Sequence, residues 1–155
     1  MCKQIESLTL MNFIARYQKI LILGVIIIIA FLLRFKAATL QSVWHDEAYV
    51  IHNAKFTSEI FKDKYDAPLY FLIISAISKL TDSYIIFRLV SILFSLASLL
   101  LIFIITKKVG GNKFGYLSSF YYAISAFSIH YAWQIRMYSL YSLLGLASIY
   151  YVTIL

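Results

Sequence analysis

Two adjacent carboxylates, Asp46 and Glu47, follow the first long apolar segment within the string Trp44-His45-Asp46-Glu47-Ala48. An ionised group beside hydrocarbon is costly, so it usually has a partner or a function. A carboxylate in this place could act as a general base toward a hydroxyl group. Because adjacent side chains on a helix diverge, the two acids are not expected to form a paired-carboxylate dyad. The structural alternative is that Asp46 caps a helix beginning at Glu47, with both acids at its positive end.

Two arginines, Arg88 and Arg136, are candidate partners of an anionic ligand, and each lies in or beside an apolar segment. A guanidinium group is planar, permanently charged and matches phosphate oxygens with two hydrogen bonds, so it could clamp a lipid phosphate. The structural alternative is that both side chains extend to the membrane surface, as arginines near helix ends commonly do. Tyr138 flanks Arg136, although an aromatic belt at the membrane surface explains most of the nearby aromatic residues.

The three histidines, His45, His52 and His130, are scattered along the chain. His45 stands beside the two acids and could help to bind a divalent metal ion, whereas a lone histidine is more often a polar interfacial residue. The sequence has no zinc-type Cys/His cluster, no P-loop and no GxGxxG motif. Cys2 is the single cysteine, which excludes a disulfide within the chain. No cofactor is therefore predicted with certainty, and a divalent metal is the one candidate.

The composition predicts an integral membrane protein. Of the 155 residues, 62% are hydrophobic and 14% are charged, whereas soluble domains have about 25% charged residues. The formal net charge is +7. Anionic lipid head groups and the positive-inside rule explain this excess better than nucleic acid does, so nucleic acid is not an expected partner.

Four apolar segments predict an all-α membrane fold with about four transmembrane helices. Crossing the bilayer core takes about 20 residues. The predicted spans are approximately 17–35, 84–106, 114–133 and 137–155. The first ends near Arg34, whose side chain is expected to reach back to the interface. The alternative for this first segment is a cleaved signal peptide.

Residues 36–83 are predicted to form an extracytoplasmic loop containing interfacial helices. Glu47–Phe61 predicts a short amphipathic helix from its apolar spacing. The positions that recur on one face are Ala48, Ile51, Ala54, Ser58 and Phe61. Pro68–Leu80 is apolar but has only 13 residues, so a helix there would be about 20 Å long, too short for a hydrocarbon core of roughly 30 Å. We expect it to lie in the interface, with Pro68 in its first turn.

Basic residues predict the orientation of this multi-pass protein. The N-terminal segment and the loop Lys107–Lys113, which is broken at Gly110-Gly111, carry more Lys and Arg than acidic residues. The positive-inside rule therefore places both in the cytoplasm and the loop 36–83 outside. Four charged residues then meet at the extracytoplasmic face: Asp46, Glu47, Arg88 and Arg136.

Five strings, taken in order, resemble the GT-C superfamily of membrane glycosyltransferases. The nearest similarity is to dolichyl-phosphate-mannose protein mannosyltransferases and bacterial lipid A aminoarabinose transferases. The strings are Leu32-Leu33-Arg34-Phe35, Ser42-Val43-Trp44-His45-Asp46-Glu47-Ala48-Tyr49, Ala67-Pro68-Leu69-Tyr70-Phe71, Phe87-Arg88-Leu89-Val90-Ser91 and Ile129-His130-Tyr131-Ala132-Trp133-Gln134-Ile135-Arg136-Met137-Tyr138. They extend over nearly the whole chain.

The resemblance implies transfer of a sugar from a polyprenyl-phosphate donor to an acceptor hydroxyl outside the cytoplasm. Asp46 would be the general base, with Glu47 as the second acid of the motif in a positioning role. Arg136 would stabilise the departing lipid phosphate, supported by Arg88, and Tyr138 would belong to the same donor-binding group. The implied partners are the sugar donor, a lipid, polysaccharide or protein acceptor, and membrane lipids.

The chain departs from these families at three positions and in length. Gln134 stands where many relatives carry Glu, Tyr141 where protein mannosyltransferases carry an acid, and Ala67 where the loop commonly has a proline. Relatives have several hundred residues, so this chain is expected to be the N-terminal part, without the C-terminal part that helps to bind substrate.

The alternative function is a non-catalytic or truncated membrane subunit that packs against other membrane proteins through faces of small residues. These faces comprise Ser91, Ser95, Ala97, Ser98, Ser118 and Ser119. A transporter fragment is a more distant alternative, because the sequence has no pair of broken helices.

Overall fold

A computed structural model describes residues 2–54 and 67–154, and the side chains of residues 17–54 and 67–153. The regular structure of these residues is entirely helical, as predicted. The helices are α1 (Cys2–Leu40), α2 (His45–Ala54), α3 (Pro68–Ser78), α4 (Tyr84–Ile124), α5 (Ala126–Ala132) and α6 (Tyr138–Ile154). Two helical stretches, Tyr17–Leu40 and Tyr84–Ile124, are long and apolar enough to cross a membrane. The fold is thus all-helical, with two candidate membrane spans.

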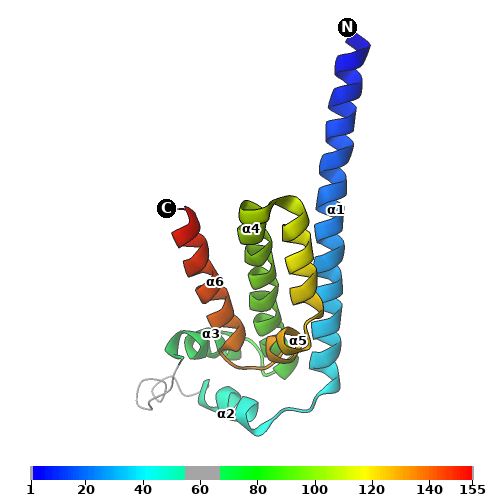
Figure 1. The fold of residues 1–155 in the computed structure, drawn as a ribbon. Coiled ribbons are helices and arrows are strands. Elements are labelled where there is room, and N and C mark those ends of the chain that lie inside the picture. The colour runs from blue at the N-terminus through cyan, green and yellow to red at the C-terminus, as the bar shows by residue number, and fades with distance from the viewer. Residues whose placement is uncertain (1, 55–66, 155) are drawn as a thin grey trace.

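Helix α4 is a hairpin of two arms that lie side by side (Figure 1). The chain reverses at Gly111, whose φ of 80° lies in the region that favours glycine. The break that the sequence predicts at Gly110-Gly111 is therefore present. A Cβ atom on Gly115 would lie 2.9 Å from a ring carbon of Phe103, so a glycine here lets the two arms approach closely.

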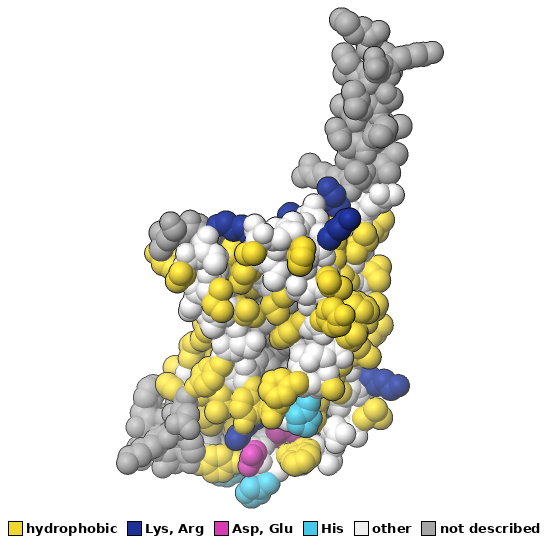
Figure 2. Space-filling model, in the orientation of Figure 1, with side chains coloured by type: hydrophobic (Ala, Val, Ile, Leu, Met, Phe, Trp, Pro, Cys, Tyr) yellow, Lys and Arg dark blue, Asp and Glu magenta, His cyan; other side chains and the backbone are white. Residues whose placement is uncertain are grey.

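The helices form a bundle with one crowded end (Figure 1). Helix α1 and α6 both pack against α4, whereas α2, α3 and α5 gather at the end where α1 finishes. Figure 2 shows acidic and histidine side chains at the α2 end, several Lys and Arg side chains toward the opposite end, and hydrophobic side chains between. Several large apolar side chains of α1 point outward, including Leu21, Val25, Ile28 and Leu32. Such a surface fits contact with hydrocarbon.

The boundaries of the expected spans differ from the helices in two places. Helix α1 continues to Leu40, so the first loop begins later than residue 36. The expected span 114–133 is broken, because α4 ends at Ile124 and α5 begins at Ala126. Ser125 between them is extended, and its side chain accepts a hydrogen bond from the backbone N–H of Ser128. A serine cap thus competes with continuation of the helix.

The two loop helices are largely as predicted. Helix α3 begins at Pro68, which occupies the first turn, and ends at Ser78. Helix α2 begins two residues before the expected start at Glu47, and residues 55–61 of the predicted helix lie outside the described residues. Its buried face includes Val50 and Ala54 but not Ala48, which is exposed. Val50 and Ala54 pack with α3 into the core at the crowded end.

Candidate active site

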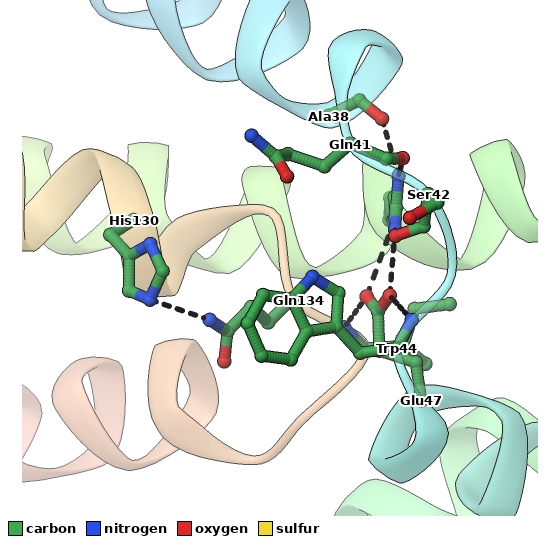
Figure 3. Close-up of polar contacts among 9 residues, drawn as sticks. Ala38, Gln41, Ser42, Trp44, Glu47, His130 and Gln134 are labelled. Atoms are coloured by element: carbon green, nitrogen blue, oxygen red, sulfur yellow. Dashed lines mark hydrogen bonds and ion pairs between the residues drawn. The ribbon is translucent and has the colours of Figure 1, made fainter.

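Glu47 lies at the centre of the crowded end, with 2% of its surface exposed. Its carboxylate accepts hydrogen bonds from Nε and Nη2 of Arg88, at 3.3 and 2.6 Å. It also accepts from the backbone N–H groups of Ile135 at 2.9 Å and Trp44 at 3.2 Å. Figure 3 shows these bonds converging on the Glu47 carboxylate. One side chain therefore joins α2, α4 and the connection between α5 and α6.

The bond from Trp44 changes the expected capping of α2. The helix begins at His45, so Glu47 is its third residue and reaches back to the backbone N–H that precedes the helix. This is the glutamate half of a capping box. The expectation that Asp46 caps a helix beginning at Glu47 is therefore wrong, and Asp46 is left with its carboxylate outside the cap.

Arg88 is fully buried, and all five of its N–H donors are engaged. Besides Glu47, it donates to the carbonyl oxygens of Ala38, Gln41 and Ser42 at the end of α1 (Figure 3). Its Cζ atom lies 4.6 Å from the centre of the Trp133 ring. In this arrangement Arg88 has no donor left for a phosphate. The sequence predicts that Arg88 helps to bind the lipid phosphate, and the described contacts do not leave it free to do so. It acts here by positioning the end of α1 against α2 and α4.

Asp46 and Arg136 form a second acid–arginine pair, on the outside of the same structure. Oδ2 of Asp46 lies 3.4 Å from Nη2 of Arg136, and their side chains are 66% and 26% exposed. Asp46 and Arg136 are the chain neighbours of Glu47 and Ile135, so the buried Glu47–Ile135 bond brings the exposed pair together. The predicted divergence of the two acids is confirmed, since one points into the bundle and the other away from it.

Arg136 lies between two hollows in the surface. The smaller, of about 60 Å³, is lined by Asp46 together with Trp44, Glu47, Gln134 and Tyr138. The larger, of about 220 Å³, lies between α2, the N-terminal part of α3 and Met137, which precedes α6, and most of its lining is apolar or aromatic. Tyr138 lies beside Arg136, with its ring centre 5.9 Å from the guanidinium carbon. The structure thus groups Asp46, Arg136, Tyr138 and Gln134 around one opening.

Gln134 and the histidines complete the surroundings. The Nε2 atom of Gln134 lies 3.0 Å from Nε2 of His130, and Figure 3 shows the two side chains facing each other. His45 is exposed in the first turn of α2. Within residues 2–54 and 67–154, no group of three or more His, Cys, Asp or Glu side chains is placed to hold a metal ion. Binding of a divalent metal stays a prediction.

Tyr70 lies beneath the larger hollow and is almost fully buried. Its hydroxyl and the hydroxyl of Ser91 are hydrogen-bonded at 2.8 Å. Burial raises the pKa of Tyr70 well above its ordinary value, and the bond to Ser91 only partly opposes this. The floor of this hollow is therefore a neutral phenol at physiological pH.

Arg34 is a buried arginine that the sequence interpretation placed at the membrane surface. Its side chain has no exposed area, and its five donors are all engaged. Nε donates to Ser95 Oγ at 3.0 Å and Nη2 to Ser128 Oγ at 2.7 Å. The remaining acceptors are the carbonyl oxygens of Ala30, Tyr122 and Ala123. Helix α1 continues for six residues beyond Arg34, so this arginine is not at the helix end, where it could extend to the membrane surface.

Comparison of the chain with protein-family models, curated proteins and solved structures gave no significant match.

Proposed function

We propose that this chain is the N-terminal membrane module of a GT-C-type glycosyltransferase that takes a sugar from a polyprenyl-phosphate donor. Asp46 is the general base and Arg136 binds the donor phosphate. The observation that carries the proposal is the exposed Asp46–Arg136 contact, which the buried Glu47–Arg88 pair holds in place. A base and a phosphate-binding group on a rigid support are the two elements that this transfer needs.

The reaction follows from these two groups. The phosphate of the donor replaces Asp46 as the partner of Arg136 and leaves the Asp46 carboxylate able to accept a proton. The acceptor oxygen then forms a bond to the anomeric carbon while its proton passes to Asp46. The bond between the anomeric carbon and the phosphate oxygen breaks, and the electron pair leaves on the polyprenyl phosphate, whose charge Arg136 stabilises. Tyr138 flanks the departing phosphate.

The membrane arrangement supports this proposal. We assign the four spans that the sequence predicts to α1, the two arms of α4 and α6. Helices α2, α3 and α5 then lie at the extracytoplasmic interface. The positive-inside rule fits this orientation, because Lys107, Lys108 and Lys113 are next to the hairpin turn at the end of the bundle away from α2. A lipid-linked phosphate would enter at the depth of Arg136.

The position of the small residues argues against the alternative of a packing subunit. Four of the six residues of the predicted small-residue faces are buried within this chain, namely Ser91, Ser95, Ser98 and Ser119. They pack α4 against the other helices of the same chain, so that face is not open to a second protein. The alternative would need a different contact surface.

Transfer of radiolabelled sugar from polyprenyl-phosphate donors tests the proposal. Membranes containing the chain are compared with membranes containing Asp46→Asn. Asp82→Asn, in the connection between α3 and α4, serves as a control acid. We expect transfer with the unchanged chain and with Asp82→Asn, and loss of transfer with Asp46→Asn. Equal signals from all three proteins, each correctly inserted, would contradict a catalytic role for Asp46.

The phosphate-binding role of Arg136 is tested separately from catalysis. Binding of the donor to Arg136→Gln is compared with binding to the unchanged chain in the same membranes. We expect weaker binding, because a charged bidentate contact is lost. Equal binding of the donor to Arg136→Gln and to the unchanged chain would contradict this role of Arg136.

A further inference from the structure

The buried arginines Arg34 and Arg88 have similar backbone partners but different side-chain partners. Each donates to carbonyl oxygens at the C-terminal end of a helix, Arg88 at the end of α1 and Arg34 at the end of α4. Arg88 also holds the Glu47 carboxylate. Among the described side chains, Arg34 has no acidic partner. Where Arg88 has the carboxylate, Arg34 has the hydroxyl groups of Ser95 and Ser128.

The charge of Arg34 is therefore only partly balanced. A helix C-terminus contributes the equivalent of about half a negative charge. The two serine hydroxyls are neutral and contribute dipoles alone. A buried cation in a membrane bundle usually has a stronger counter-charge than this. A nearby anion would meet a favourable potential.

The two serines also line a cavity of about 350 Å³ between α4, α5 and α6. A hydroxyl group that accepts an N–H from Arg34 keeps its own proton for a different acceptor. Tyr122 lines the same cavity, with its hydroxyl 3.4 Å from Ser95 Oγ and its ring 5.4 Å from the Arg34 guanidinium carbon. The wall beside Arg34 thus offers O–H donors with a positive charge behind them.

The rest of the cavity is largely carbon. Its lining includes the aromatic rings of Phe127, Tyr131 and Tyr138, and no acidic side chain lines it among the described residues. A cavity of a few hundred cubic ångströms with an apolar lining and a few polar groups is typical of a ligand site. The polar groups here favour an anion, and the rings favour an apolar body attached to it.

We propose that this cavity binds the phosphate group of an amphiphilic ligand. The hydroxyls of Ser128, Ser95 and Tyr122 donate to the phosphate oxygens, and the aromatic rings contact the apolar part. The site does not depend on the proposed transferase function. Its lining shares Tyr138 with the smaller hollow beside Arg136, shares no residue with the larger one, and includes neither Arg136 nor Asp46.

The proposal is tested by titrating farnesyl phosphate into the protein in phosphatidylcholine nanodiscs. The Arg136→Gln form is used, so that the phosphate site proposed at Arg136 does not contribute. We expect farnesyl phosphate to bind about tenfold or more tightly than farnesol, which lacks the charge. Ser128→Ala should weaken farnesyl phosphate about tenfold, and Ser128→Thr, which keeps the hydroxyl, should restore the affinity. Ser148→Ala, on α6 outside the cavity lining, should bind as the parent does.

Competition by inorganic phosphate shows whether the cavity recognises the phosphate group alone or the phosphate together with its apolar body. Effective competition by it means that phosphate alone is sufficient, whereas weak competition means that the apolar body is needed as well. Equal binding of farnesol and farnesyl phosphate would overturn the proposal. So would unchanged affinity of folded Ser128→Ala, or preferential binding of a neutral alkyl glucoside. None of these results changes the Asp46-dependent transfer assay, so the two proposals fail independently.

Discussion

Two acid–arginine pairs originate from adjacent acids on one helical turn, and their surroundings give them opposite properties. Glu47 and Arg88 are buried, meet at 2.6 Å and have their hydrogen bonds filled by the chain itself. Asp46 and Arg136 meet at 3.4 Å and remain in reach of solvent. The first pair holds the backbone in place, and the second is open to a ligand. The motif therefore divides structure and chemistry between neighbouring residues.

The two pairs also differ in how much each is expected to contribute to the free energy of unfolding. Removing one partner of a buried ion pair leaves an uncompensated charge, whereas exposed pairs contribute little to stability. Substitutions along this series should therefore lower the free energy of unfolding by decreasing amounts.

The largest effect is expected for Arg88→Met, which leaves the Glu47 carboxylate buried without its cation. We expect the free energy of unfolding to fall by about 3–5 kcal/mol. Unfolding in mixed detergent–SDS micelles, followed by circular dichroism, measures this loss. Arg136→Met deletes the same charge from the exposed pair and is the matched control. Similar losses in both variants would remove the distinction between the pairs.

Ser95→Ala is expected to come next, because it leaves Nε of the buried Arg34 without its acceptor. The cost of an unsatisfied buried donor is about 1–3 kcal/mol. Ser98→Ala is the control, since Ser98 Oγ bonds to the carbonyl of Phe94 within its own helix. The same unfolding measurement applies. A loss for Ser95→Ala no greater than for Ser98→Ala would mean that Arg34 does not need this hydroxyl.

Tyr70→Phe should cost about 0.5–1.5 kcal/mol through loss of the hydrogen bond to Ser91. Its pH dependence sharpens the prediction. Burial raises the pKa of Tyr70 above the ordinary value of 10.0. The unfolded chain then loses a proton that the folded chain keeps, so the stability from this group is complete below about pH 10 and is lost as the pH rises further. The unfolding free energy of the unchanged chain should fall more steeply between pH 9 and 11 than that of Tyr70→Phe, and parallel curves would contradict this.

The smallest effect on stability is expected for Asp46→Asn, within about 1 kcal/mol, because the pair is exposed. Its effect on sugar transfer should be far larger, about 10²–10⁴-fold, which is the usual contribution of a general base. Measuring both quantities on one preparation separates a catalytic residue from a structural one. A loss of several kcal/mol with unchanged transfer would reverse the assignment of the two pairs.

The sequence predicts much of this arrangement because its signals are local. Apolar runs give α1, the first arm of α4 and α6, Pro68 marks the start of α3, and adjacency alone separates Asp46 from Glu47. The partners of Arg34 and Arg88 could not be predicted in this way. Apart from the Ala30 carbonyl, four positions from Arg34, their acceptors lie 41 to 94 positions away along the chain. Only the packing of helices therefore decides whether each arginine reaches the surface or is buried.

The sequence does not predict the break at Ser125, and the reason is again a partner that is remote in the chain. Serine is compatible with a helix interior, and the segment 114–133 contains several serines that do not interrupt it. Ser125 ends the helix because its side chain caps α5 and because Arg34 takes the last carbonyl groups of α4. The second of these partners is remote in sequence, so no local pattern marks the position.

The burial of Arg34 also sets an order for assembly during synthesis. When α1 leaves the ribosome, four of the five acceptors of the Arg34 hydrogen bonds do not yet exist, and the last of them, Ser128, follows 94 positions later. At ordinary translation rates this interval is on the order of ten seconds. Over that time an arginine within an otherwise apolar helix is poorly suited to lipid. The full set of Arg34 hydrogen bonds therefore forms only after the α4 hairpin and α5 have been synthesised.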